Sequence, residues 1–85
     1  MKEFSFTITD PIGIHARPAG LLVKFLHGFA SKITIVKGDK KADPKSMLSL
    51  MGLAAKCGET LTVQLEGDQA EAEAEKLEAY MKENF

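Results

Sequence analysis

The sequence predicts an α+β fold in the order βαββαβα, a mostly antiparallel four-stranded sheet covered on one side by three helices. Two segments, 2–9 and 60–66, alternate apolar and polar residues, which is typical of half-buried strands. Apolar residues recur at spacings of three and four after His15 and after Gly67, which is typical of amphipathic helices. This two-layer arrangement leaves one face of the sheet open to solvent.

Length and composition indicate one domain, residues 1–85, of an ordinary globular protein. The chain is 45% hydrophobic and 27% charged, with a formal net charge of −1, which excludes disorder and bulk nucleic-acid binding. A domain this small buries little more than about 60% of its unfolded surface, so function is expected on the surface. No stretch is typical of a signal peptide or a membrane span, so we expect a cytoplasmic protein without nucleic-acid or membrane partners. The single cysteine, Cys57, is expected to be a semi-buried or loop thiol without a metal.

The first half of the chain predicts a strand, a helix and a hairpin. The strand 2–9 places Phe4, Phe6 and Ile8 on one face, and residues 10–13 follow as a turn. The helix after His15 carries an apolar stripe of Leu22, Phe25, Leu26 and Phe29 and weakens at Gly28. Residues 32–37 and 40–42 are then expected to pair across the tight turn Gly38-Asp39, the second of them as a charged edge strand.

The second half predicts a short helix, a strand and a long helix. Ser46 is well placed as the N-cap of the short helix, which Gly52 and Gly58 limit. The strand 60–66 places Leu61, Val63 and Leu65 on one face. Asp68 and Glu71 fit a capping box for the long helix, whose apolar stripe is Ala70, Ala74, Leu77 and Met81. Its Glu- and Lys-rich outer face is expected to be solvated.

The stretch Gly13-Ile14-His15-Ala16-Arg17-Pro18-Ala19-Gly20 is the strongest functional candidate. The glycine permits a sharp turn, and His15 falls at or just before the first helical residue. Free N–H groups and the positive end of the helix dipole attract anions there, and Arg17 adds a guanidinium. His15 has no sequence-adjacent carboxylate or second histidine that would make it a metal ligand or a triad base. Its own ring nitrogen is therefore the expected nucleophile. The stretch predicts a phosphate site containing a nucleophile, while His27 at the far end of the helix is read as structural.

This octapeptide closely resembles the active-site signature of the HPr family, the histidine-containing phosphocarriers of the phosphoenolpyruvate-dependent sugar phosphotransferase system. A second segment, 45–53, resembles the family's regulatory serine and docking helix, so the resemblance covers essentially the whole chain. It implies an open-faced β-sandwich in which the His15 turn and the Ser46 helix are neighbours. Two residues depart from the family pattern. Ile12 affects the polarity of the loop beside His15, and Gly20 affects the stiffness of the first helix.

The resemblance implies a phosphoryl carrier that is not itself an enzyme and needs no cofactor or metal. His15 would accept a phosphoryl group on Nδ1 from enzyme I and pass it to enzyme II A domains, with Arg17 stabilising the phosphate. Ser46 would be a regulatory site phosphorylated by HPr kinase/phosphorylase, and the phosphorylated form would bind catabolite control protein A, as in Gram-positive relatives. We expect a monomer.

The docking surface is predicted around the short helix, because so short a helix cannot bury every face. Methionine-rich patches adapt to several partners, and lysines would form a basic rim. The predicted partner-binding residues are Gly20, Lys24, Lys45, Met47, Leu48 and Met51.

Two alternatives stay open. A regulatory paralogue, serving nitrogen or carbon control, would share these motifs. A small hydrolase of the acylphosphatase type would share the size and element order, but it needs an amide side chain to position water. The only asparagine is Asn84, and Gln64 and Gln69 lie away from the turn.

Overall fold

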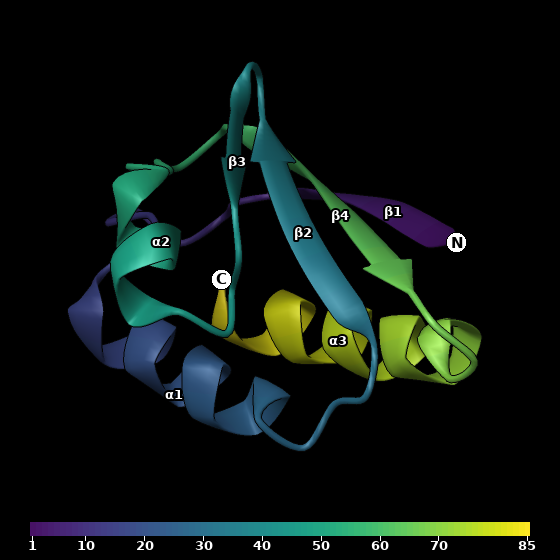
Figure 1. Cartoon of the computed structure of the whole chain (residues 1–85). Coiled ribbons are helices and arrows are strands. Elements are labelled where there is room, and N and C mark those ends of the chain that lie inside the picture. Colours follow the sequence, from purple (N-terminus) through teal and green to yellow (C-terminus); the bar gives the residue numbers. More distant parts are fainter.

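The strands form one antiparallel sheet with the spatial order β1-β4-β2-β3. The computed structural model describes residues 1–85, and its elements follow the predicted order (Figure 1). In chain order they are β1 (Lys2–Thr7), α1 (Ala16–Leu26), β2 (Lys32–Lys37), β3 (Lys40–Ala42), α2 (Met47–Gly52), β4 (Thr60–Glu66) and α3 (Ala70–Asn84). The charged strand β3 lies at the edge, as predicted.

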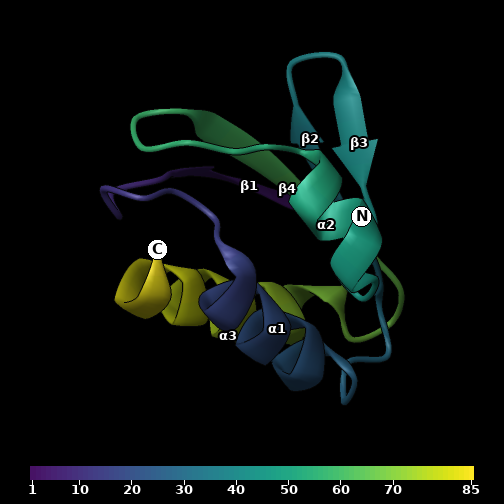
Figure 2. The same ribbon diagram turned by 90° about the vertical axis from the view of Figure 1, so that its left-hand side faces the viewer.

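The helices lie on one side of the sheet, which leaves the other face open (Figure 2). The inner faces of β2 and β4 pair Ile33 with Leu65 and Ile35 with Val63, and all four side chains are buried. They join the buried stripes of α1 and α3 in one core cluster of 20 residues. The open-faced β-sandwich is therefore confirmed. No helix combines the length and the apolar character needed to cross a membrane.

Strand β1 is two residues shorter than predicted. Its ladder with β4 ends at the pair Thr7 and Thr60, although the Ile8 N–H still donates to the Glu59 carbonyl oxygen. The N–H groups of Thr9 and Asp10 instead donate to the carbonyl oxygen of Phe85, at 2.7 and 2.6 Å. This change of partner turns the chain away from the sheet and toward the His15 turn.

The helices α1 and α3 meet through aromatic rings. Phe25 of α1 stacks on Tyr80 of α3 with ring centroids 4.3 Å apart, and it meets Phe29 edge-on at 5.1 Å. Leu22 and Leu26 of the predicted stripe are fully buried, whereas Phe25 and Phe29 are half-buried against the core. Helix α1 ends at Leu26 with His27 as its C-cap, which agrees with a structural place for His27.

Two predictions for α3 are wrong, one on how the helix starts and one on the solvation of its polar face. The N-cap is Gln69 without a side-chain bond, so the Asp68–Glu71 capping box is wrong. Glu73 is buried, because its carboxylate accepts hydrogen bonds from the loop between α1 and β2. These come from the N–H groups of Ala30 and Ser31, at 2.8 Å each, and from the Ser31 hydroxyl.

Candidate functional site

The turn before α1 is built by Asp10 and Gly13. The Asp10 carboxylate accepts a bond from the Ile12 N–H at 2.9 Å, and the Asp10 carbonyl accepts one from the Gly13 N–H at 2.9 Å. Gly13 has φ +81°, and a Cβ there would lie 2.5 Å from the carbonyl oxygen of Ala55. The next N–H, of Ile14, donates to that same oxygen at 3.0 Å. Only glycine allows the turn to dock this closely on the loop that contains Ala55.

The loop beneath the turn, residues 54–59, is held from two sides. Glu59 accepts a bond from the Lys56 N–H at 2.7 Å, and Lys37 of β2 reaches both the Glu59 carboxylate at 3.4 Å and the Ala54 carbonyl at 3.3 Å. The Lys56 N–H, more than the charge of Lys37, lowers the pKa of Glu59 below its usual value. These contacts fix the loop on which the His15 turn packs.

His15 is the N-cap residue of α1, as predicted, and its side chain is not used for capping. The backbone there is extended, with φ −124° and ψ 173°, and the imidazole makes no cap hydrogen bond. About a third of the ring is accessible, with a relative exposure of 37%. The ring is therefore free to react with a partner at the surface.

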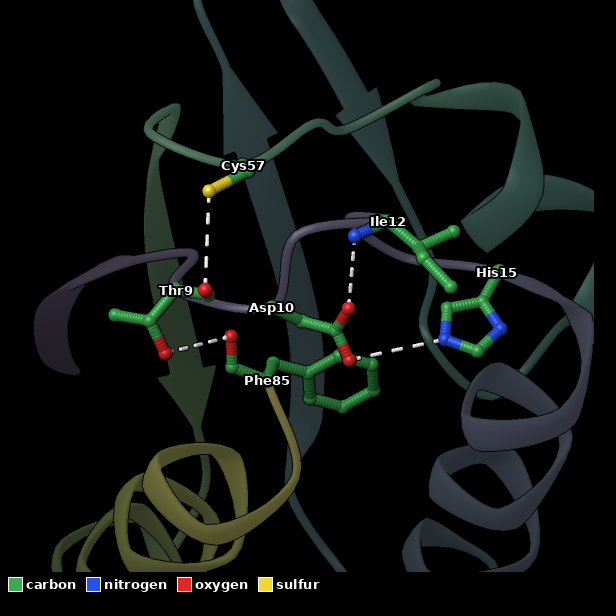
Figure 3. A network of polar contacts seen from close by, with 6 residues as sticks. All are labelled: Thr9, Asp10, Ile12, His15, Cys57 and Phe85. Carbon is green, nitrogen blue, oxygen red and sulfur yellow. Dashed lines mark hydrogen bonds and ion pairs between the residues drawn. The ribbon is translucent and has the colours of Figure 1, made fainter.

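A carboxylate lies beside this ring, which the sequence reasoning missed. Oδ2 of Asp10 lies 3.7 Å from Nε2 of His15. Figure 3 shows the carboxylate facing the edge of the ring. No carboxylate is adjacent to His15 in sequence, but the glycine turn folds the chain back so that a residue five positions earlier reaches it. The Asx-type turn signal at Asp10-Pro11 could have indicated this return.

The first turn of α1 presents unpaired donors. The N–H groups of Ala16 and Arg17 make no hydrogen bond in the structure, and Pro18 has no N–H to offer. The Arg17 guanidinium is exposed and forms no ion pair. Two backbone donors, the positive helix end and a free guanidinium therefore occupy the start of the same helix as His15, a set of groups that suits an oxyanion.

The helix after Ser46 packs beside α1. Ser46 is its N-cap, and the Ser46 hydroxyl accepts a bond from the Ser49 N–H at 3.3 Å, as predicted. Helices α1 and α2 are in contact and lie side by side in Figure 1. The Met47 methyl carbon lies 4.0 Å from where a Cβ on Gly20 would stand. A Cβ at position 20 would therefore make only an ordinary van der Waals contact with Met47. The expected closeness of the two helices is confirmed.

The predicted docking residues differ in exposure. Leu48 is 86% exposed and Met51 is partly exposed, whereas Met47 packs against the core. Lys24 is exposed, while the ammonium of Lys45 donates to the carbonyl oxygens of Phe29 and Ser31, at 2.8 and 3.0 Å. Two further large apolar side chains that were not predicted as docking residues, Ile12 and Leu21, are also exposed.

Cys57 is an exposed thiol in the loop beneath the turn, which is the second of the two expected environments. Its sulfur lies 3.7 Å from the carbonyl oxygen of Thr9 (Figure 3). No group of three or more His, Cys, Asp or Glu side chains is placed to hold a metal ion.

The chain is similar to known proteins over nearly its whole length. The family model described as PTS HPr component phosphorylation site matches residues 2–83. The phosphocarrier protein HPr of Lysinibacillus sphaericus is 43% identical over 83 residues, which cover 98% of this chain and 94% of that protein. A solved structure of a Mycoplasma histidine-containing phosphocarrier protein matches with a TM-score of 0.91 at 36% identity, covering 96% of this chain and 93% of that one.

A regulatory relative is also similar. The HPr-like protein Crh of Bacillus subtilis is 38% identical over 71 residues, which cover 84% of each chain. A solved structure of Crh, described as a swapped dimer, has a TM-score of 0.77 at 34% identity and covers 93% of this chain and 91% of that one.

Proposed function

Because the chain belongs to the PTS HPr family of phosphocarriers, we propose that His15 accepts a phosphoryl group on Nδ1 from phosphorylated enzyme I and passes it to sugar-specific enzyme II A domains. The observation that carries the proposal is the accessible imidazole of His15 at the N-terminus of α1, uncommitted as a cap. The unpaired N–H groups of Ala16 and Arg17 begin the same helix.

The transferred group carries about two negative charges, which the start of α1 can stabilise. A helix N-terminus contributes roughly 0.3–2 kcal/mol toward an anion, and a charged hydrogen bond from Arg17 roughly 1.5–3 kcal/mol. Their sum is enough to hold a phosphoryl group but leaves it able to move to another acceptor. In this proposal the protein is a substrate of enzymes and has no catalytic turnover of its own.

Labelling with enzyme I and phosphoenolpyruvate tests the acceptor. The variant His15→Ala should take up no label, because it lacks the nucleophile. The matched control is His27→Ala, which removes the chain's other histidine from the opposite end of α1 and should label like the unchanged protein. Equal labelling of the His15→Ala variant would reject His15 as the acceptor.

We also propose that Ser46 is a regulatory phosphorylation site. A phosphate at a helix start is electrostatically tolerated, so the fold should survive while the surface gains about 1.5 to 2 negative charges. Ser46→Asp should therefore slow phosphoryl transfer from enzyme I several-fold with little loss of stability. Ser5→Asp, on the open face of the sheet, adds the same charge far from α2 and should leave the rate unchanged. If Ser46→Asp also leaves it unchanged, the regulatory proposal is wrong.

The docking surface in this proposal consists of the first turn of α1 and the exposed side of α2. It includes Gly20, Lys24 and Lys45 with Met47, Leu48 and Met51, and it would serve enzyme I, enzyme II A domains, HPr kinase/phosphorylase and catabolite control protein A. The exposure of Leu48 and Met51 supports it, since large apolar side chains open to solvent are typical of interaction surfaces. Leu48→Gln should weaken transfer from enzyme I with no loss of stability, while Leu48→Met should preserve transfer.

A regulatory paralogue is the second candidate, and the similarity to Crh favours it. Such a protein would act through Ser46 without carrying phosphoryl groups to sugar transporters. Transfer of label from His15 to a purified enzyme II A domain would decide for the carrier. The solved structure of Crh is described as a swapped dimer, whereas we propose a monomer for this protein. The mass of this protein in solution should therefore be measured. The acylphosphatase-type alternative predicts turnover of an acyl phosphate, which a carrier lacks.

A further inference from the structure

The Asp10 carboxylate has its two oxygens in different environments. Oδ1 accepts the hydrogen bond from the Ile12 N–H, which fixes the side-chain rotamer. The backbone of Asp10 is held as well, because its N–H donates to Phe85 and its carbonyl accepts from Gly13. Oδ2 makes no hydrogen bond and faces His15 (Figure 3). Asp10 thus presents one oriented, negatively charged oxygen to the imidazole.

The two nitrogens of the His15 ring lie in different surroundings. Nε2 is the nitrogen that faces Asp10 at 3.7 Å, and Nδ1 lies on the other edge of the ring (Figure 3). A neutral imidazole carries its proton on one nitrogen and its lone pair on the other. A negative oxygen beside Nε2 attracts the proton to Nε2 and repels a lone pair there.

We propose that Asp10 is a positioning residue, which holds the proton of neutral His15 on Nε2 so that the lone pair is on Nδ1. The inference rests on the proposed function, in which Nδ1 is the phosphoryl acceptor. The lone pair of Nδ1 forms the new bond to phosphorus, while the donor keeps the electron pair of the bond that breaks. The proton on Nε2 stays in place throughout, so the step needs no proton transfer.

The variant Asp10→Asn tests this proposal, because the hydrogen bond from the Ile12 N–H determines the orientation of the new amide group. If the amide oxygen keeps the bond from the Ile12 N–H, the NH2 group must face Nε2 of His15. The opposite orientation would place two donors against each other. The amide should therefore favour a lone pair on Nε2 and a proton on Nδ1, the reverse of the wild-type arrangement. Asp10→Ala removes the bias without reversing it.

The matched control is Asp43→Asn. Asp43 also accepts a hydrogen bond from the N–H two residues later, in this case Lys45 at 2.9 Å, but it faces no histidine. The substitution makes the same chemical change in the same kind of turn. It should alter neither the tautomer of His15 nor phosphoryl transfer.

Two readouts are needed. Nitrogen-15 chemical shifts of the two histidines at about pH 9, where imidazoles are neutral, report the tautomer without any phosphorylation, and His27 is the internal reference. Phosphorylation by enzyme I reports the rate, which should fall in proportion to the population of the competent tautomer. A competent fraction lowered to about a tenth in Asp10→Asn should slow transfer about tenfold, with Asp10→Ala between the two.

An unchanged tautomer in Asp10→Asn would overturn the proposal, as would a changed tautomer with an unchanged rate. Equal slowing by Asp43→Asn would overturn it too, because the effect would then come from the turns in general. Failure of the proposed function has a different signature. In that case the wild-type protein takes no label on His15, while the tautomer shift in Asp10→Asn is still seen.

Discussion

Replacing the buried Glu73 by glutamine is expected to lower the free energy of unfolding by about 2 to 3 kcal/mol at pH 7. The carboxylate accepts bonds from the Ala30 N–H, the Ser31 N–H and the Ser31 hydroxyl. An amide keeps one acceptor oxygen and sets its NH2 group against a buried or half-buried N–H. One charged hydrogen bond, worth about 1.5–3 kcal/mol, is lost, and those that remain become weaker neutral bonds. The lower cost of burying a neutral group offsets part of the loss.

The same contacts predict a pH dependence. Burial alone would raise the pKa of Glu73, but the bonds from Ser31 and Ala30, with the charge of Lys45, outweigh it and hold the pKa below 4.5. A carboxylate with a lowered pKa in the folded state stabilises the fold fully above its unfolded pKa and loses this contribution as the pH falls through the folded value. The difference between wild type and Glu73→Gln should therefore be largest at neutral pH and should shrink below about pH 4.5.

Thermal and urea unfolding at pH 7 and pH 3 measure both effects. For a chain of this size a loss of about 2 to 3 kcal/mol lowers Tm by about 10 °C or more. Glu75→Gln is the control, because Glu75 is exposed on the same helix and forms no hydrogen bond or ion pair. If the two variants agree to within about 0.5 kcal/mol at pH 7, or if the gap for Glu73→Gln is equal at both pH values, the reasoning is refuted.

Three further substitutions, two of them paired with a control variant, test the turns and the cap by thermal unfolding. Ala54 has φ +50°, which costs a residue with a Cβ about 1–2 kcal/mol, so Ala54→Gly should raise stability by about 0.5 to 1 kcal/mol. Ala79→Gly, at an exposed position in the interior of α3, should lower it by about 1 kcal/mol, and destabilisation by both would show that Ala54 is unstrained. Gly13→Ala should cost about 3 kcal/mol, from a strained φ and a clash with backbone. Gly58→Ala, with φ +87° and open space, carries only the strain of about 1–2 kcal/mol, so equal losses would contradict the docking of the turn. Ser46→Ala should cost about 1 kcal/mol by removing the cap of α2, and no loss would show that its bond to Ser49 is unimportant.

The sequence by itself determined the features that follow from a regular spacing of residues along the chain. Alternation identified β4 and all of β1, with two residues too many at the end of β1, and the apolar spacing identified the buried faces of α1 and α3. Ser46 and Gly13 were recognisable because a helix cap and a sharp turn depend on residues within a few positions. His15, the candidate phosphoryl acceptor, was found for the same reason, since its turn and its helix start are adjacent in sequence.

Only the tertiary structure decided which distant groups meet. Glu73 belongs to a charged, regular helix face, yet the loop at Ala30 and Ser31 turns it into a buried acceptor. Asp10 reaches His15 because the glycine turn docks on the loop near Ala55, and Lys45 binds carbonyl groups of another loop. Periodicity records whether a residue faces the core or the solvent, whereas these contacts depend on how separate elements pack, which no local pattern encodes.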